Sequence, residues 1–428
     1  MTKATIEGWQ NWSGGQSAAP ARIFKPQSAA ELAAALPDLP TPIRPVGSGH
    51  SFTPLVPTDG TIIDIAALNG IVRVDGTQAT LRAGSQLRTI GAAMRERDLA
   101  FKNQGDIDHQ TIGGALGTGT HGTGLSHGSF SDTLIGCSFL LADGTKWQPS
   151  NEDELNAARV SVGTLGLMTE ATLDLTPAYD LAEESQALPL DEALAAVHGN
   201  QYRHAEFFAF PHADNVILKT LDIATNAHDD WPDAEPLPQI DEETTEDVMF
   251  KSAATTLRFF PNLAPALHQS LMAGIGVDRR KGPSNLIFPS PRNARFNEME
   301  YAVPLSQGPN AIRAVIAAMR EEGPACMWPV EYRTLPASTA WLSPAFERDS
   351  VTISIHQYGP VNPKPLFGLI EPLLRKFEGR PHWGKMHSCS APDLRALYPR
   401  FDDFGTLRQK LDPEDRLLNP ALANWLAV

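Results

Sequence analysis

The chain has 428 residues, 42% of them hydrophobic and 20% charged, and a formal net charge of −15 at pH 7. Its length predicts two domains of ordinary size, and its acidity argues against nucleic acid or an anionic membrane as a partner. Three cysteines, no apolar leader and no long apolar run favour a cytoplasmic protein without a spanning helix.

The N-terminal part mixes helix and strand signals. Ser28 and Glu31 form a capping-box pattern ahead of an alanine-rich stretch, which predicts a helix. Strand-like runs follow at 42–46 and 61–68, and the Asp75-Gly pair predicts a hairpin turn. This pattern indicates an α+β domain.

The second half has its own strand signals. Residues 228–247 are rich in acids and proline, which predicts a solvated or mobile loop, with an acidic docking surface as the alternative. Beyond this loop, strands are expected at 295–304, 327–335 and 350–358, and an amphipathic helix at 311–322. We therefore expect a second domain with a separate sheet.

Two glycine-rich segments point to a ligand. RPVGSGHSFT (44–53) lacks the third glycine of a dinucleotide fingerprint and the lysine of a Walker loop. Gly47 and Gly49 still permit a tight turn whose N–H groups cradle a phosphate. In TIGGALGTGTHGTGLSHG (111–128), glycine alternates with Ile, Leu and Thr. That composition favours a backbone pressed against a large flat ligand over a flexible linker.

Four histidines in this region, His50, His109, His121 and His127, raise the question of a metal site. None of them form an HxH or HxxxH pair, the spacings typical of a metal site, so we predict no metal. A structural, hydrogen-bonded role for His50 is the alternative to a role in ligand binding.

Several motifs together resemble a known family. GSGHS at 47–51 and the glycine string at 113–124 are similar to the FAD domain of vanillyl-alcohol-oxidase-type flavoproteins. The nearest resemblance is to their sugar-lactone branch, which includes gulonolactone, arabinonolactone and alditol oxidases. The other motifs that carry it are WQNW (9–12), GTLGLMTEATL (163–173), PVEYR (329–333), WLSPAFERDS (341–350), HWGKMH (382–387) and the segment from LYPRFDDF to LDPEDRLLNP (397–420).

The resemblance implies a two-domain α+β fold of the PCMH type. Residues 1–178 would bind FAD, 179–380 would form an α+β substrate-binding cap, and 381–428 would return to the FAD domain. His50 would carry a covalent bond to the flavin. The other implied cofactor-binding residues are Pro45, Val46, Gly47, Ser48, Gly49, Ser51, Gly105, Asp106, Thr111, Gly114, Thr118, Gly119, Thr120, His121, Leu167, Met168 and His382.

The resemblance also implies a catalytic set of Glu331, Arg333 and Lys385. Glu331 and Arg333 are two residues apart in an extended run, so both leave the same strand face. From the residues alone, a strand-face ion pair is the alternative. Oxidation of a carbinol needs a base for the O–H proton and a fixed cation beside the reduced flavin, and these residue types supply both. Sequence leaves open which group takes the proton.

Two departures bear on the substrate. Asp106 stands where alditol oxidases carry a serine, and Ser354 stands where they place a histidine, with His356 on the same face. We take Asp106, Ser354 and His356 as substrate-binding residues. These changes favour a small polyhydroxylated lactone, which makes an aldonolactone oxidase the main hypothesis and an alditol oxidase the alternative.

Gly105 bears on the electron acceptor. In the family that this chain resembles, a small residue at this position controls the access of oxygen to the flavin. Glycine there favours an oxidase that releases hydrogen peroxide. A dehydrogenase with an external acceptor is the alternative. A non-catalytic sugar- or flavin-binding module is the hypothesis from a different class, and it requires that no polyol or lactone reduces the flavin.

Overall fold

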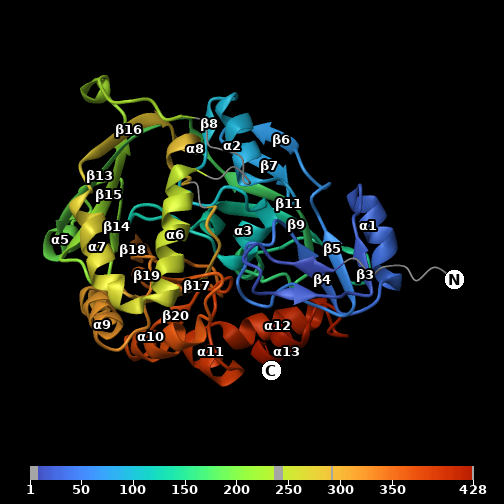
Figure 1. Cartoon of the computed structure of the whole chain (residues 1–428). Coiled ribbons are helices and arrows are strands. Elements are labelled where there is room, and N and C mark those ends of the chain that lie inside the picture. The colour runs from blue at the N-terminus through green and yellow to red at the C-terminus, as the bar shows by residue number, and fades with distance from the viewer. Residues whose placement is uncertain (1–7, 236–243, 291–292, 427–428) are drawn as a thin grey trace.

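The computed structural model describes residues 8–235, 244–290 and 293–426. Figure 1 shows one large sheet and a group of smaller sheets lying side by side, with the C-terminal helices running beneath both. Among helices within these ranges, none combines the length and the hydropathy that crossing a bilayer requires. Part of the acidic segment 228–247, namely 236–243, lies outside the described residues.

The N-terminal part is built on small sheets. A parallel sheet has the spatial order β3 (Arg22–Phe24), β5 (Thr61–Asp64) and β4 (Ile43–Val46). An antiparallel sheet has the order β10 (Lys146–Trp147), β9 (Leu134–Leu140), β11 (Leu167–Asp174), β7 (Gln78–Arg82) and β6 (Ile71–Asp75). Two-stranded pairs are β1 (Trp9–Gln10) with β2 (Ser17–Ala18), and β8 (Leu99–Ala100) with β12 (Thr176–Pro177).

The helices of this part are α1 (Ala29–Ala35), α2 (Leu87–Arg95), α3 (Ile112–Thr118) and α4 (Glu152–Arg159). Ser28 caps α1 through its side chain, and Asp75 pairs with Gln78 across the β6–β7 turn, so both local predictions are confirmed. Helix α3 was not predicted, because three glycines fall within it. Thr111 caps its first turn, and the missing Cβ of Gly113 permits close packing on Ala83.

The second part is an eight-stranded antiparallel sheet. Its spatial order is β16 (Asp278–Pro283), β13 (Asp180–Pro189), β15 (Asn215–Ile223), β14 (His204–Ala209), β18 (Val330–Leu335), β19 (Ser350–Tyr358), β17 (Phe296–Pro304) and β20 (Arg380–Pro381). Its helices are α5 (Leu190–His198), α6 (Thr245–Phe259), α7 (Ala264–Ala273), α8 (Ser284–Ile287), α9 (Gly308–Glu321) and α10 (Lys364–Lys376).

The two faces of this sheet differ in chemistry. Alternate strand residues such as Phe207, Tyr332 and Ile353 join a hydrophobic core with helices α5, α9 and α10. The residues between them, such as Glu331 and Ser354, point to the opposite face. That face is rich in carboxylates, although its strands are buried.

The described C-terminal residues end in three α-helices, α11 (Ala391–Leu397), α12 (Phe401–Leu411) and α13 (Pro420–Trp425). The loop between α12 and α13 returns to the N-terminal part, where the Arg416 carbonyl accepts a hydrogen bond from the Ile43 backbone at 2.7 Å. The Arg416 guanidinium donates to the Ala142 carbonyl at 2.6 Å. The division at 1–178, 179–380 and 381–428 is kept as a proposal.

Candidate active site

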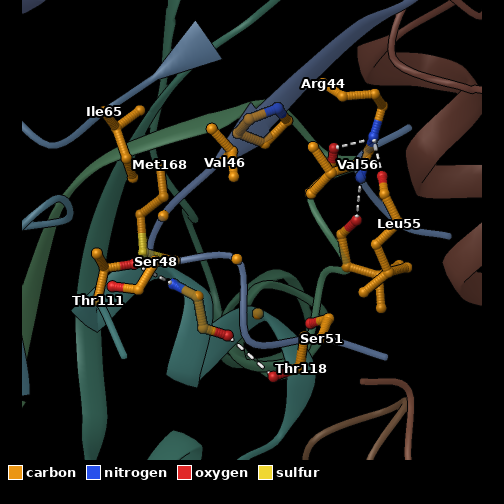
Figure 2. Close-up of a pocket in the computed structure, with 18 of the residues that line it drawn as sticks. Arg44, Val46, Ser48, Ser51, Leu55, Val56, Ile65, Thr111, Thr118 and Met168 are labelled. Atoms are coloured by element: carbon orange, nitrogen blue, oxygen red, sulfur yellow. Dashed lines mark hydrogen bonds between the residues drawn. The ribbon is translucent and has the colours of Figure 1, made fainter. Parts of the chain in front are cut away.

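A first cavity of about 920 Å³ lies in the N-terminal part. Figure 2 shows Val46, Ile65 and Met168 on one side of it, and Leu55 and Val56 on another. Most of its remaining lining is glycine, serine and threonine. A cavity bounded by backbone and small side chains suits an elongated ligand that the main chain holds closely.

The turn at 47–51 offers unused hydrogen-bond donors to this cavity. Within the described part of the chain, the backbone N–H groups of residues 47–51 donate no hydrogen bond. The turn is also sterically fixed, because a Cβ on Gly47 would lie 2.1 Å from the Thr111 hydroxyl. Consecutive free N–H groups form a concavity that attracts a phosphate. These features fit the pyrophosphate of FAD.

Arg44 organises one wall of this cavity, and sequence reasoning missed it. Its guanidinium is fully buried and donates to the carbonyls of Leu55, Val162, Gly163 and Leu417 at 2.6–2.8 Å. Burial lowers its pKa to about 9, against the opposing effect of Asp412. Because these carbonyls belong to segments far apart in the sequence, one side chain holds the wall together.

A second cavity of about 740 Å³ adjoins the first, and His50, Ser51, Gln110 and Thr118 line both. The His50 ring packs against Trp12, with ring centroids 5.5 Å apart, and against His109. Burial, followed by the nearby His109 and Lys385, lowers the pKa of His50 to about 4. At neutral pH the His50 imidazole is therefore uncharged, and it stands where the two cavities meet.

The charged face of the eight-stranded sheet lines the second cavity. Arg333 lies among three carboxylates. Its Nη2 is 2.6 Å from Asp106 and 3.3 Å from Glu331, and its Nε is 2.5 Å from Glu206. These carboxylates outweigh burial and raise the pKa of Arg333 well above its ordinary value. Nη1 has no hydrogen-bond partner among the described residues, so it is available to a ligand.

Lys385 enters the second cavity from the C-terminal segment. Its ammonium group forms a close ion pair with Glu298 and lies 5.1 Å from the centre of the Phe52 ring. Glu298 is also 3.6 Å from the His356 Nε2, which lies 3.9 Å from Glu331. The Lys385 cation and the Arg333 group are thus connected along one sheet face.

His121, Glu300 and His382 form a buried cluster whose nitrogen and oxygen atoms lie within 4.8 Å of one another. Both His121 nitrogens face acceptors at 2.8 Å, the Gly122 carbonyl and Glu300. Burial opposes the charged form, but Glu300 outweighs it and raises the pKa of His121. The geometry suits an imidazolium–carboxylate pair, because these nitrogens are already engaged within the protein.

The remaining member, His382, ties the C-terminal segment to this cluster. Its Nδ1 accepts a hydrogen bond from the Gly384 N–H at 3.1 Å, and its backbone N–H donates to the Glu300 carbonyl. Burial lowers the pKa of His382 to about 3, so its ring is neutral. His382 therefore supports the cavity wall.

Most of the predicted site residues line one of the two cavities. The first contains Pro45, Val46, Gly47, Ser48, Gly49, His50, Ser51, Thr111, Gly114, Thr118 and Met168. The second contains His50, Ser51, Gly105, Asp106, Thr118, Thr120, His121, Glu331, Arg333, His356, His382 and Lys385. The predicted residues that line neither are Gly119, Leu167 and Ser354.

Each of these three has another place in the fold. Gly119 ends helix α3 with a φ of 75°, and Leu167 is buried in the core beside the first cavity. Ser354 donates a hydrogen bond to Glu300 at 2.8 Å. Ser354 thus lies behind the carboxylate that lines the cavity.

Glu206, Glu298 and Glu300 were missed by sequence reasoning. Their strands read as ordinary buried strands, and a carboxylate in such a strand has no motif of its own. The signal was present in FNEMEYAVP (296–304), where Glu298 and Glu300 alternate with large apolar residues. Two carboxylates on one face of a buried strand indicate that ion-pair or hydrogen-bond partners lie on the neighbouring strands.

Gly105 lines the second cavity, but its missing side chain has a structural reason. A Cβ at this position would lie 2.7 Å from the His121 carbonyl oxygen. The glycine therefore lets two backbone segments approach closely. Its effect on oxygen access stays a prediction.

Comparison with known proteins agrees with this architecture. The family model of D-arabinono-1,4-lactone oxidase matches residues 171–426, and an FAD-binding domain model matches residues 20–148. An L-gulono-1,4-lactone dehydrogenase of Mycobacterium tuberculosis is 35% identical over 96% of this chain and 97% of its own length. An L-gulonolactone oxidase of Mus musculus is 30% identical, with 97% of each chain covered.

A more distant relative is an alditol oxidase of Streptomyces, 27% identical over 97% of this chain and 98% of its own length. Among solved structures, the cholesterol oxidase of B. sterolicum superposes with a TM-score of 0.79 at 17% identity, covering 98% of this chain and 96% of that one. This likeness confirms the α+β, PCMH-type FAD-binding fold. With a family model over more than half of its length and relatives of 30% identity or more matched over nearly their whole length, the chain belongs to the D-arabinono-1,4-lactone oxidase family of FAD-dependent oxidoreductases.

Proposed function

We propose that the protein oxidises a carbinol of a small sugar lactone. The observation that carries this proposal is the junction at His50, where a cavity suited to FAD meets a cavity lined by Glu331, Arg333 and Lys385. FAD, when bound, supplies a two-electron acceptor for the substrate hydride. The gulonolactone and arabinonolactone names of the relatives support a lactone, and the Streptomyces relative supports an alditol as the second candidate.

The proposed catalytic residues on the charged face have different roles. Arg333 offers Nη1 to a substrate oxygen, while its other nitrogens are held by carboxylates. Glu331 and His356 lie beside it as acceptors for the O–H proton. Lys385, held by Glu298, supplies a fixed cation that stabilises negative charge developing in the second cavity.

The cavity's charge favours a neutral substrate. Asp106, Glu298, Glu300 and Glu331 all line it and outnumber its permanent cations, Arg333 and Lys385, so the cavity would repel the carboxylate of a hydrolysed, open-chain acid. Asp106 lines this cavity and is held by Arg333, which supports its proposed role in binding substrate hydroxyls. His356 is the other proposed substrate-binding residue, and Ser354 acts only through Glu300.

We further propose that FAD is attached through His50. The uncharged ring, without a hydrogen-bond partner among the described residues, supports a nucleophilic nitrogen at the cavity junction. The link would form when a His50 ring nitrogen replaces one hydrogen of the flavin methyl group; two protons would be released to solvent, and two electrons would pass to molecular oxygen, the acceptor proposed below. After acid precipitation the yellow colour should stay in the pellet, and His50→Ala should move it to the supernatant. A white pellet from the unmodified protein contradicts the link.

For the acceptor we propose molecular oxygen, with hydrogen peroxide as product. Gly105 and the oxidase names among the relatives support it, whereas the Mycobacterium relative supports a dehydrogenase. Peroxide formed in step with lactone consumption is the expected result. Rapid turnover with ferricyanide and none with oxygen would show the alternative.

The test of the whole proposal is an anaerobic screen of the purified flavoprotein. Aldonolactones should bleach the flavin absorbance faster than alditols, and free aldonates should leave it unchanged. Faster bleaching by alditols would reverse the order of the two substrate classes, and no bleaching would favour a binding module.

The three cysteines, buried and unpaired, support the proposed cytoplasmic location.

A further inference from the structure

A row of alternating charges crosses five neighbouring strands of the large sheet. Arg280 on β16 pairs with Glu183 on β13 at 2.9 Å, and Glu183 with Lys219 on β15 at 3.4 Å. Lys219 lies 3.5 Å from Glu206 on β14, which lies 2.5 Å from the Arg333 Nε on β18. The row thus runs from the edge strand to the second cavity.

The strand register builds this row. Glu183 is directly opposite Arg280, and Glu206 is opposite both Lys219 and Arg333. The side chains of Glu183, Lys219, Glu206 and Arg333 are 9% exposed or less, whereas that of Arg280 is 26% exposed. The register and the ion pairs place all five on one face of the sheet, the face on which Arg333 contacts Asp106 of the N-terminal part.

Stability alone does not account for such a row. Removing four charges from water is costly, and apolar residues of similar volume are often at least as stabilising. Burial disfavours the charged form of Lys219, yet Glu183 and Glu206 outweigh this and raise its pKa. Each buried charge is stabilised by the opposite charge beside it. A row of this kind indicates that its last residue, Arg333, needs a charged partner.

Arg333 needs such a partner because its planar guanidinium group must be held in one orientation to bind the substrate. Glu206 holds Nε, and Asp106 and Glu331 hold Nη2, which leaves Nη1 for the substrate. Glu206 comes from the neighbouring strand β14, where it lies directly opposite Arg333, and its 2.5 Å contact is the shortest of the three. The Lys219 charge balances the carboxylate that Glu206 adds.

We propose that Glu206 is a positioning residue that sets the orientation of the Arg333 guanidinium, and that Lys219 and Glu183 hold Glu206 in place. The proposal rests on the proposed role of Arg333 in binding the substrate oxygen. Glu206 itself does not line the second cavity. Its effect on the reaction therefore passes through Arg333.

Substitutions along the row test this inference. Glu206→Gln should lower kcat/KM by roughly 30-fold with unchanged FAD content, since misplacement of a binding group is costly. Lys219→Met should lower it by about 10-fold and Glu183→Gln by about 3-fold, in order of distance from Arg333. Glu184→Gln is the matched control, because Glu184 lies on the same strand, points to the opposite face and pairs with the exposed Arg279. It should keep the unmodified rate.

A charge-neutral double variant separates positioning from folding. Glu206→Gln combined with Lys219→Met removes both partners, so thermal stability should recover above that of Lys219→Met alone. The rate should stay low, and calorimetric binding of a lactone without the oxidisable hydroxyl should stay about 10-fold weaker than in the unmodified protein. Recovery of stability, rate and affinity together would show that the row is only structural.

The parent proposal and this inference fail differently. If Arg333→Ala keeps the unmodified rate of flavin reduction, the proposed role of Arg333 is wrong. If Arg333→Ala abolishes reduction while Glu206→Gln matches the Glu184→Gln control in rate and affinity, the role of Arg333 stands and the positioning inference is overturned.

Discussion

The two cavities that meet at His50 are built by different means. The first is formed by turns and helix α3, and it presents glycine, backbone N–H groups and small hydroxyls. The second is formed by neighbouring strands of one sheet, and it presents long charged side chains. The first is lined mainly by two short segments, residues 44–56 and 110–118, whereas the second depends on a few residues from each of several strands far apart in the sequence.

This difference explains why one region was easier to predict. A backbone cradle leaves a local signature, because glycine must occur where the chain approaches its ligand. A charged sheet face leaves almost none, because each strand contributes only one or two charged residues. Substitutions in the two cavities should therefore have separable effects, retention of FAD in one and rate in the other.

The largest expected effect is in the second cavity. Arg333→Ala should slow anaerobic flavin reduction by about 10²–10³-fold while FAD content stays unchanged, because a preorganised cation is lost. Arg333→Lys keeps the charge but loses the fork, so an intermediate rate is expected. Stopped-flow absorbance measures both. Loss of FAD in either variant would contradict the separation of the two cavities.

The next effect is in the wall of the first cavity. Arg44→Met should lower the free energy of unfolding by about 3 kcal/mol, because it leaves buried carbonyls without donors. It should also release FAD more readily. Arg22→Met is the matched control, since Arg22 is exposed and its guanidinium lies over the Phe24 ring. Denaturant unfolding checks both variants, and equal losses would remove the special role of Arg44.

Acid should lower the free energy of unfolding, because several buried histidines are neutral in the folded protein. Burial lowers the pKa of His50 and His387 to about 4, and that of His204 and His382 to about 3. Between these values and an unfolded pKa of about 6.5, the unfolded chain binds more protons, so stability falls as pH falls. The raised pKa of His121 acts in the opposite direction.

The unfolding midpoint is therefore expected to drop by roughly 5 °C between pH 7 and pH 5. Differential scanning fluorimetry across this range measures the change. His387→Asn, a variant outside both cavities, should reduce the slope without altering FAD content. A midpoint that rises on acidification would show that His121 and its Glu300 pair dominate.

The smallest effect is at Gly117. It lies in helix α3, lines the first cavity, and a Cβ there would meet nothing within 4 Å. Gly117→Ala should raise the stability of the FAD-free protein by about 0.5–1 kcal/mol and weaken FAD binding. Gly368→Ala, also in open space within a helix, should give the first change without the second. Tighter FAD binding by Gly117→Ala would contradict the cradle.

Much of the fold was predictable from local chemistry. Ser28 caps α1 and the Asp75-Gly pair turns the β6–β7 hairpin, because each acts on residues within one turn of itself. Helix α3 was missed because its glycines argue against a helix, and packing on Ala83 overrides that weak local preference. Close backbone packing therefore outweighs the low helix propensity of glycine in this helix.

The sequence by itself determined the cradle at 44–53 and 111–128, the family, and the strand-face pair Glu331 and Arg333. Only the tertiary structure decided that Glu206, Glu298 and Glu300 stand beside them, and that Ser354 lies behind Glu300. The physical reason is register: a strand's alternation fixes which residues share a face, but pairing between distant strands fixes which charges meet.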